Sequence, residues 1–230
     1  MIHRIAIATH HRRYDTLVGA LESLDAYEVL HIRERTELTR RKLEEFGAEW
    51  VFFPHWSWMI PPDIHENFRA VIFHMTDVPY GRGGSPLQNL ILRGHESTKL
   101  TALRCEAELD TGPVYLKRDL SLAGTAEEIF KRASELMRPM IREMVEQDLC
   151  ATPQRGEPTN FKRRTPYQSA IDGTDGLQHA YDHIRMLDAE GYPHAFAETG
   201  HYRIEFTDAE LGEDGALYAR ARITQKDYET

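Results

Sequence analysis

The sequence has few cysteines and no long apolar run. Its two cysteines, Cys105 and Cys150, are far apart and form no CxxC spacing, which argues against a zinc-finger or dithiol redox motif. No stretch approaches the roughly 18 consecutive apolar residues that a membrane-spanning helix needs. The N-terminal segment is too short and turns polar too soon for a signal peptide. We therefore expect a cytoplasmic protein that binds no membrane.

Positive charge is also scarce. Lys and Arg number 28 against 37 Asp and Glu, so the formal net charge is −9. This balance disfavours attraction to phosphate backbones, and we expect no nucleic-acid partner. The glycine-rich residues 81–84 lack the Lys-Ser or Lys-Thr that completes a phosphate-binding loop. His10 and His11 are adjacent and lack the spacing of metal ligands, so we expect no metal.

What the chain does contain is an ordinary globular balance, with 41% hydrophobic and 28% charged residues among 230. Strand-like apolar runs at residues 4–9, 28–32, 50–54 and 70–74 alternate with helical patterns at 15–24 and 37–46. This alternation predicts an α/β fold whose mostly parallel, twisted sheet carries helices on its faces. Ligands of such sheets bind at the carboxyl ends of the strands, which is where His10, His55 and His74 are expected.

The later part of the sequence predicts a smaller second domain. A short helix at 86–92 and strands at 99–106 and 114–118 precede a long helix, which Thr125 and Glu128 open as a capping box. Residues 151–166 are rich in Pro, Gly and Thr and are interpreted as a linker. Beyond it, one helical pattern around 177–187 and strands at 202–206 and 217–223 predict a small α+β subdomain. We thus expect a catalytic domain at 1–150, a linker at 151–166 and a C-terminal subdomain at 167–230.

Two motifs carry the candidate chemistry. His74 ends an apolar run, and Asp110 lies in a Leu-Asp-Thr-Gly turn, at residues 109–112, just before another strand. An imidazole exchanges protons near neutral pH, and a carboxylate can orient it and stabilise its charged form. The two residues are therefore candidates for a proton-handling pair. The alternatives are an interior histidine with satisfied hydrogen bonds and an ordinary turn aspartate.

The spacing of His74, Pro79, Arg82, Gly83 and Pro86, followed by the Leu-Asp-Thr-Gly turn, resembles the folate-dependent formyltransferases. That family includes methionyl-tRNA, glycinamide ribonucleotide and sugar N-formyltransferases, and the resemblance runs loosely over residues 5–206. It implies a Rossmann-like formyltransferase domain, 10-formyltetrahydrofolate as the formyl donor, and no metal.

The resemblance also implies that His74 and Asp110 are catalytic. The family's third catalytic residue is an asparagine two positions before the histidine, and this chain has Ile72 there. Isoleucine donates no hydrogen bond, so a developing oxyanion would need another donor.

Binding residues follow from the resemblance and from the predicted sheet edge. By resemblance, the folate lies against the loop after the third strand and the turn before residue 112. The predicted folate contacts are Met59, Ile60, Leu109 and Asp110. The predicted substrate contacts, which include cations placed to meet a diphosphate, are His10, Arg12, Arg13, Thr76 and Arg82. A packed surface loop or dimer contact, and a solvated basic loop, are the alternatives for these two regions.

We therefore predict an enzyme that transfers a formyl group from 10-formyltetrahydrofolate to the amine of a small substrate, most simply a nucleotide-linked amino sugar. The C-terminal segment is short for the RNA-binding barrel of methionyl-tRNA formyltransferases, which favours the sugar branch. The first alternative is a binding protein that keeps the fold but has lost transfer because of Ile72. The second is a methionyl-tRNA formyltransferase-like enzyme acting on another amine. The exposed aromatic loop and short sheet edges are compatible with a homodimer.

Overall fold

The computed structural model describes residues 2–226 and consists of two compact units. The first unit comprises residues 1–83, 98–120 and 130–160, and the second comprises 84–97, 121–129 and 161–230. Each unit is thus built from three segments of the chain. The division predicted from the sequence, with a catalytic domain at 1–150, a linker at 151–166 and a subdomain at 167–230, stays a prediction. Among the described residues, no helix is both long and apolar enough to cross a membrane.

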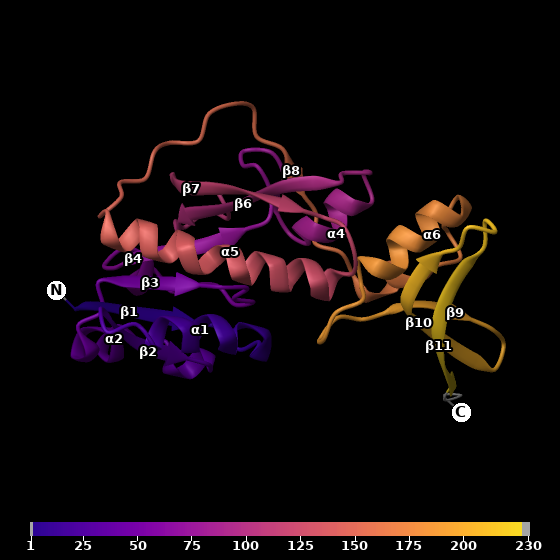
Figure 1. Ribbon diagram of the computed structural model, residues 1–230, viewed down its shortest axis with the longest axis horizontal. Helices are drawn as coiled ribbons and strands as arrows, with labels where there is room; N and C mark the ends of the chain where they lie inside the picture. Colours follow the sequence, from indigo (N-terminus) through magenta and orange to yellow (C-terminus); the bar gives the residue numbers. More distant parts are fainter. Residues whose placement is uncertain (1, 227–230) are drawn as a thin grey trace. The chain divides into compact units, whose positions relative to one another are not determined.

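A six-stranded sheet forms the centre of the first unit, in the order β2-β1-β3-β4-β6-β7. β1 pairs in parallel with β2 and β3, β3 pairs in parallel with β4, and β6 runs antiparallel to β4. The strands are β1 (His3–Ala8), β2 (Tyr27–Ile32), β3 (Trp50–Phe53), β4 (Arg69–His74), β6 (Ser97–Arg104) and β7 (Val114–Ser121). The predicted α/β class with a mostly parallel sheet is confirmed (Figure 1).

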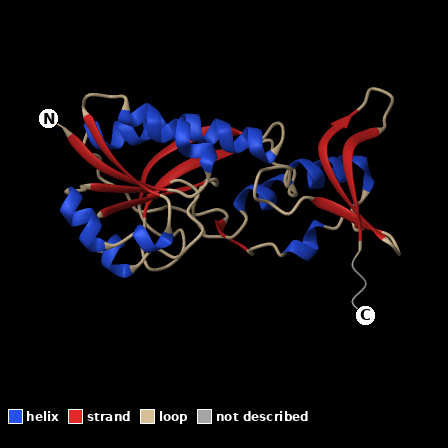
Figure 2. Ribbon diagram, turned by 90° about the horizontal axis from the view of Figure 1, so that it is seen from below, coloured by secondary structure: helices blue, strands red, loops and turns tan. Residues whose placement is uncertain are grey.

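Helices cover both faces of this sheet (Figure 2). They are α1 (Asp15–Glu22), α2 (Arg40–Phe46), α3 (Pro62–His65) and α5 (Ala126–Glu146), with 3-10 turns η1 (Arg12–Tyr14) and η2 (Arg35–Glu37). α2 begins later than the sequence pattern predicts because Thr39 caps it, its side chain accepting a hydrogen bond from the Lys42 amide. Leu43 of α2 and Ile64 of α3 belong to one buried core cluster with strand residues from a single face. The strand members of that cluster include Ala6, Ala8, Val51, Phe53 and Ala70.

The second unit holds a three-stranded antiparallel sheet in the order β11-β10-β9. Its elements are α4 (Pro86–Ile91), η3 (Pro166–Ser169), α6 (Gly176–Arg185), β9 (Ala195–Glu198), β10 (Tyr202–Leu211) and β11 (Leu217–Gln225). β9 was not expected from the sequence, because four residues carry too little alternation to predict a strand. The Arg185 guanidinium at the end of α6 donates to the carbonyls of Leu122 and Gly124, at 2.6 and 2.9 Å, and so ties α6 to residues 121–129.

Short β5 (Arg82–Gly83) and β8 (Asn160–Phe161) form a separate two-stranded sheet. β5 follows the loop after β4, and β8 lies within residues 151–166, which were interpreted as a linker. Arg82 accordingly donates its amide hydrogen to the Thr159 carbonyl, at 2.9 Å. This pairing brings a segment from beyond α5 to the loop that follows His74.

Candidate active site

His74 is the last residue of β4 and only 7% of its surface is exposed. Its Nε2 lies 2.8 Å from the Gly81 carbonyl oxygen, which also accepts a hydrogen bond from the Thr76 hydroxyl at 3.3 Å. A carbonyl oxygen can only accept, so Nε2 must carry the hydrogen of this bond. The Nδ1 atom is therefore the one that can take up and release a proton.

Asp110 lies in the connection between β6 and β7, with its backbone in the left-handed region (φ +56°). Aspartate and asparagine tolerate this conformation better than most residues. The carboxylate Oδ2 lies 3.5 Å from His74 Nδ1 and accepts a 2.8 Å hydrogen bond from the Gly83 amide. The side chains of His74 and Asp110 are 8% and 10% exposed. The two residues that the sequence predicted to converge are thus brought together in a largely desolvated place.

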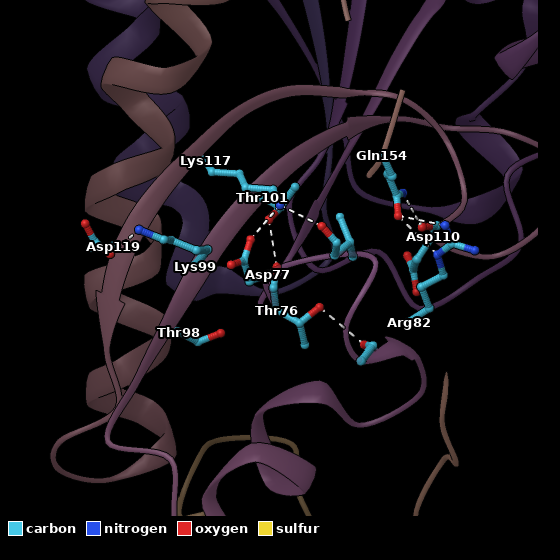
Figure 3. A network of polar contacts seen from close by, with 12 residues as sticks. Thr76, Asp77, Arg82, Thr98, Lys99, Thr101, Asp110, Lys117, Asp119 and Gln154 are labelled. Atoms are coloured by element: carbon cyan, nitrogen blue, oxygen red, sulfur yellow. Dashed lines mark hydrogen bonds and ion pairs between the residues drawn. The ribbon is translucent and has the colours of Figure 1, made fainter. Parts of the chain in front are cut away.

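The loop after β4 is held against β6 by hydroxyl groups (Figure 3). Thr101 donates to the Thr76 carbonyl at 2.7 Å, and Thr98 donates to the Met75 carbonyl at 3.3 Å. Thr76 is completely buried, and its own hydroxyl faces Gly81. The structure therefore gives Thr76 an internal bonding role, and its predicted contact with substrate stays a prediction.

Arg82 and Gln154 form a second part of this network (Figure 3). The guanidinium of Arg82 donates to Gln154 Oε1 from Nε at 3.1 Å and from Nη2 at 2.8 Å. Gln154 Nε2 in turn donates to the carbonyls of Asp110 and Gly112, both at 2.8 Å. Gln154 was not predicted from the sequence, because it stands in the predicted linker and no neighbouring residue indicates its partners.

Ile72 lies two residues before His74 and therefore on the same face of β4. Its partly buried side chain packs against the core cluster that contains Leu43 and Ile64. The resemblance predicts an asparagine at this position, but the Ile72 side chain here is an apolar part of the packing next to the core cluster. No side-chain donor for an oxyanion comes from this position.

The predicted substrate cations lie in the turn after β1, in an aromatic surrounding. The ring of His11 lies 3.8 Å from the ring of His10 and 4.4 Å from that of His55, and Arg13 lies over the Phe130 ring at 5.0 Å. Burial, followed by the charges of His10 and Arg13, lowers the pKa of His11 to about 4. Burial also lowers the pKa of His10.

These histidines are consequently neutral at pH 7. Any positive charge that the turn offers to a diphosphate comes from Arg12 and Arg13, and Arg12 is exposed. The predicted substrate contacts His10, Arg12 and Arg13 are thus of two kinds, one neutral ring and two cations.

The predicted folate contacts include two exposed apolar side chains. Met59, in the loop after β3, is 64% exposed, and Leu109, beside Asp110, is 60% exposed. Ile60 is partly buried and packs against the core cluster. Such side chains offer apolar surface to a flat ligand ring. Within residues 2–226, no three His, Cys, Asp or Glu side chains gather in a way that could hold a metal ion.

Comparison with known proteins points to one family. Residues 166–224 match the family model described as methionyl-tRNA formyltransferase, C-terminal domain. The structure described as methionyl-tRNA formyltransferase from Clostridium thermocellum is 44% identical, with a TM-score of 0.94, over 98% of this chain and 100% of that one.

A methionyl-tRNA formyltransferase of Sinorhizobium medicae is 27% identical over 73% of this chain. The match covers 57% of that relative, so the chain spans a little over half of its length. A Mycobacterium tuberculosis protein described as a likely sugar N-formyltransferase is 16% identical, with a TM-score of 0.68 and full coverage of both chains. At that identity the likeness concerns the fold.

Proposed function

The chain belongs to the formyltransferase family, and on that premise we propose that it transfers a formyl group from 10-formyltetrahydrofolate to the amine of a nucleotide-linked amino sugar. The observation that carries this proposal is the buried pair of His74 and Asp110, whose facing atoms are 3.5 Å apart. The exposed apolar side chains of Met59 and Leu109 fit the flat face of a pterin ring. The donor supplies an activated formyl carbon.

The His74–Asp110 pair supplies the proton acceptor for this reaction. As the amine nitrogen bonds to the formyl carbon and the bond to the folate nitrogen breaks, the amine must lose one proton and the leaving nitrogen must gain one. Nδ1 of His74 can take this proton and return it, because Nε2 already donates to Gly81. The carboxylate of Asp110, oriented by the Gly83 amide, stabilises the imidazolium that forms.

Charge pairing in and beside the three-stranded sheet of the second unit supports a small acceptor over a tRNA at that sheet. The arginines of its sheet, and Lys226 just after β11, are each within 3.4 Å of a carboxylate of that sheet. The pairs are Arg203 with Glu198 and Glu205, Arg222 with Glu205, Arg220 with Asp208, and Lys226 with Glu198. Binding of a nucleic-acid backbone depends on cations that neutralise phosphates, and these cations already have counter-charges.

A second candidate is formylation of methionyl-tRNA. It is favoured by the 44% identity over the full length of the Clostridium thermocellum protein, whose description names that activity. The two candidates are separated by offering wild-type protein and 10-formyltetrahydrofolate both methionyl-tRNA and a panel of nucleotide-linked amino sugars. Transfer to a sugar and none to the tRNA supports our proposal, and the reverse result replaces it.

The role of the pair is tested with His74→Ala and Asp110→Asn. We expect His74→Ala to lower turnover roughly 100-fold or more, because it removes the general base. Asp110→Asn tests the carboxylate charge, since asparagine also tolerates the left-handed backbone of this position. Unchanged turnover in both variants would remove the pair from the mechanism.

A wild-type protein that binds folate but transfers to no acceptor, and gains transfer through Ile72→Asn, would instead be a catalytically altered binding protein. The proposal requires the opposite pattern, in which wild type transfers a formyl group and Ile72→Asn loses activity because the position belongs to the core.

A further inference from the structure

Residues 152–159 are the later part of the connection between α5 and β8, and they are hydrogen-bonded to two other parts of the first unit. At one end, the amides and carbonyls of Thr152 and Val114 pair in both directions, at 2.7 and 2.8 Å. At the other end, Thr159 donates its amide hydrogen to the Pro79 carbonyl at 3.1 Å, and its hydroxyl accepts from the Gly81 amide at 2.8 Å. The segment therefore spans from the start of β7 to the loop that carries the Gly81 carbonyl.

Gln154 lies between these two ends, and its side-chain amide is fully used. Both of its hydrogens go to backbone carbonyls, those of Asp110 and Gly112. Its oxygen accepts two hydrogen bonds from Arg82. A primary amide offers two donors and two acceptor sites, so the structure satisfies every one of them (Figure 3).

The hydrogen bonds of Gln154 hold both partners of the contact between the Gly83 amide and the Asp110 carboxylate. On one side Gln154 holds the backbone of Asp110 itself, in a left-handed conformation. On the other side it holds Arg82, whose neighbour Gly83 donates its amide hydrogen to the Asp110 carboxylate. Thr159 meanwhile binds the amide of Gly81, whose carbonyl receives the Nε2 hydrogen of His74. Both partners of the His74 ring thus rest on residues 152–159.

We infer that Gln154 is a positioning residue for the formyl-transfer reaction, and that it acts by fixing the Asp110 carboxylate against His74 and the Gly83 amide. The inference rests on the proposed function for its catalytic part only, because the orientation of Asp110 can be measured without any substrate. Displacement of a catalytic group by about 1 Å can cost roughly 100-fold in rate.

Substitutions at Gln154 separate the role of its Nε2 donor from that of its Oε1 acceptor. Gln154→Glu keeps an acceptor for Arg82 but replaces both donors with an oxygen, which would face the Asp110 and Gly112 carbonyls and repel them. Gln154→Ala removes both the donor and the acceptor. The matched control is Gln147→Ala, which makes the same change at an exposed position beyond the end of α5.

The first readout is the Gly83 amide resonance in proton–nitrogen NMR spectra, with Asp110→Asn as the reference for a weakened bond. We expect the Gly83 signal to move towards its Asp110→Asn position and to exchange faster with solvent in both Gln154 variants, while Gln147→Ala and the β1 amides stay as in wild type. A Gly83 signal that does not move in Gln154→Ala overturns the inference, whether or not the protein is active.

The second readout is formyl transfer. We expect kcat to fall roughly 10- to 100-fold in Gln154→Ala, because the Asp110 carboxylate is no longer fixed against His74. KM is measured separately, since Arg82 and Asp110, which Gln154 holds, are themselves predicted ligand contacts. An unchanged kcat in Gln154→Ala would show that Gln154 does not contribute to the reaction. Transfer by wild type to no acceptor refutes the proposed function instead, and the Gly83 signal still decides whether Gln154 positions Asp110.

Discussion

The stability of the first unit should fall between about pH 6.5 and pH 4 because of the histidine cluster after β1. The pKa of His11 is lowered to about 4 by burial first and then by the charges of His10 and Arg13. Burial likewise holds the pKa of His55 well below its ordinary value. An unfolded histidine titrates near 6.5, so acidification first protonates the unfolded chain. A lowered folded pKa thus gives stability that is present above pH 6.5 and lost as the pH falls towards 4.

The magnitude for His11 follows from its two pKa values. Between about pH 7.5 and about pH 5, a histidine that titrates near 6.5 unfolded and at about 4 folded loses about 2 kcal/mol of unfolding free energy. The ring retains some solvent contact, so we expect about 1–2 kcal/mol. His55 and His10 act in the same direction, and the wild-type loss should exceed the share of His11 alone.

The assay is urea unfolding followed by tryptophan fluorescence. All three tryptophans, Trp50, Trp56 and Trp58, belong to the first unit, so the signal reports on that unit. His11→Gln removes the titrating group, and its loss of stability from about pH 7.5 to about pH 5 should be smaller than that of wild type by about 1–2 kcal/mol. His201→Gln, at an exposed position of the second unit, is the control and should match wild type.

The measured quantity is the difference between the two pH values within each protein, which cancels the packing that any substitution at residue 11 disturbs. A His11→Gln protein that loses as much stability as wild type on acidification would contradict a lowered pKa of His11 in the folded protein. Such a result would mean that the His11 ring is as accessible to protons in the folded protein as in the unfolded chain.

Two further pairs of substitutions test backbone space and core packing. Gly112→Ala would place a methyl carbon 1.9 Å from the Arg104 carbonyl oxygen, so we expect a loss of about 2 kcal/mol or more in urea unfolding. Gly19→Ala, in α1, where the new carbon meets no atom within 4 Å apart from its chain neighbours and the backbone of its own helix, should instead raise stability by about 0.5–1 kcal/mol. Met140→Ala, at a fully buried position of α5, should cost about 2–5 kcal/mol, whereas Glu135→Ala on the exposed side of the same helix should change stability by less than about 0.5 kcal/mol. Equal effects at Met140 and Glu135, or at Gly112 and Gly19, would contradict the packing described for these positions.

Most elements of the first unit were predictable because their signals are local. Apolar runs between turn residues predicted β1, β2, β3 and β4 to within about two residues. The antiparallel direction of β6 and the short β9 were not predicted, because pairing direction and four-residue strands leave little trace in a single sequence. The C-terminal segment is likewise a three-stranded sheet where two strands were expected.

The candidate site also has features that were predictable from the sequence and features that were not. From sequence alone, His74 was predicted to end an apolar strand and Asp110 to lie in a glycine turn before another strand, because residue type and neighbours a few positions away are enough for both. The contact of His74 Nε2 with Gly81, and those of Gln154 with Asp110 and Arg82, 44 and 72 positions away in the chain, depend on the folded arrangement. Such contacts depend on which parts of the chain pack together in the fold. The composition of residues 151–166 resembles that of a linker and has no periodicity that predicts these contacts.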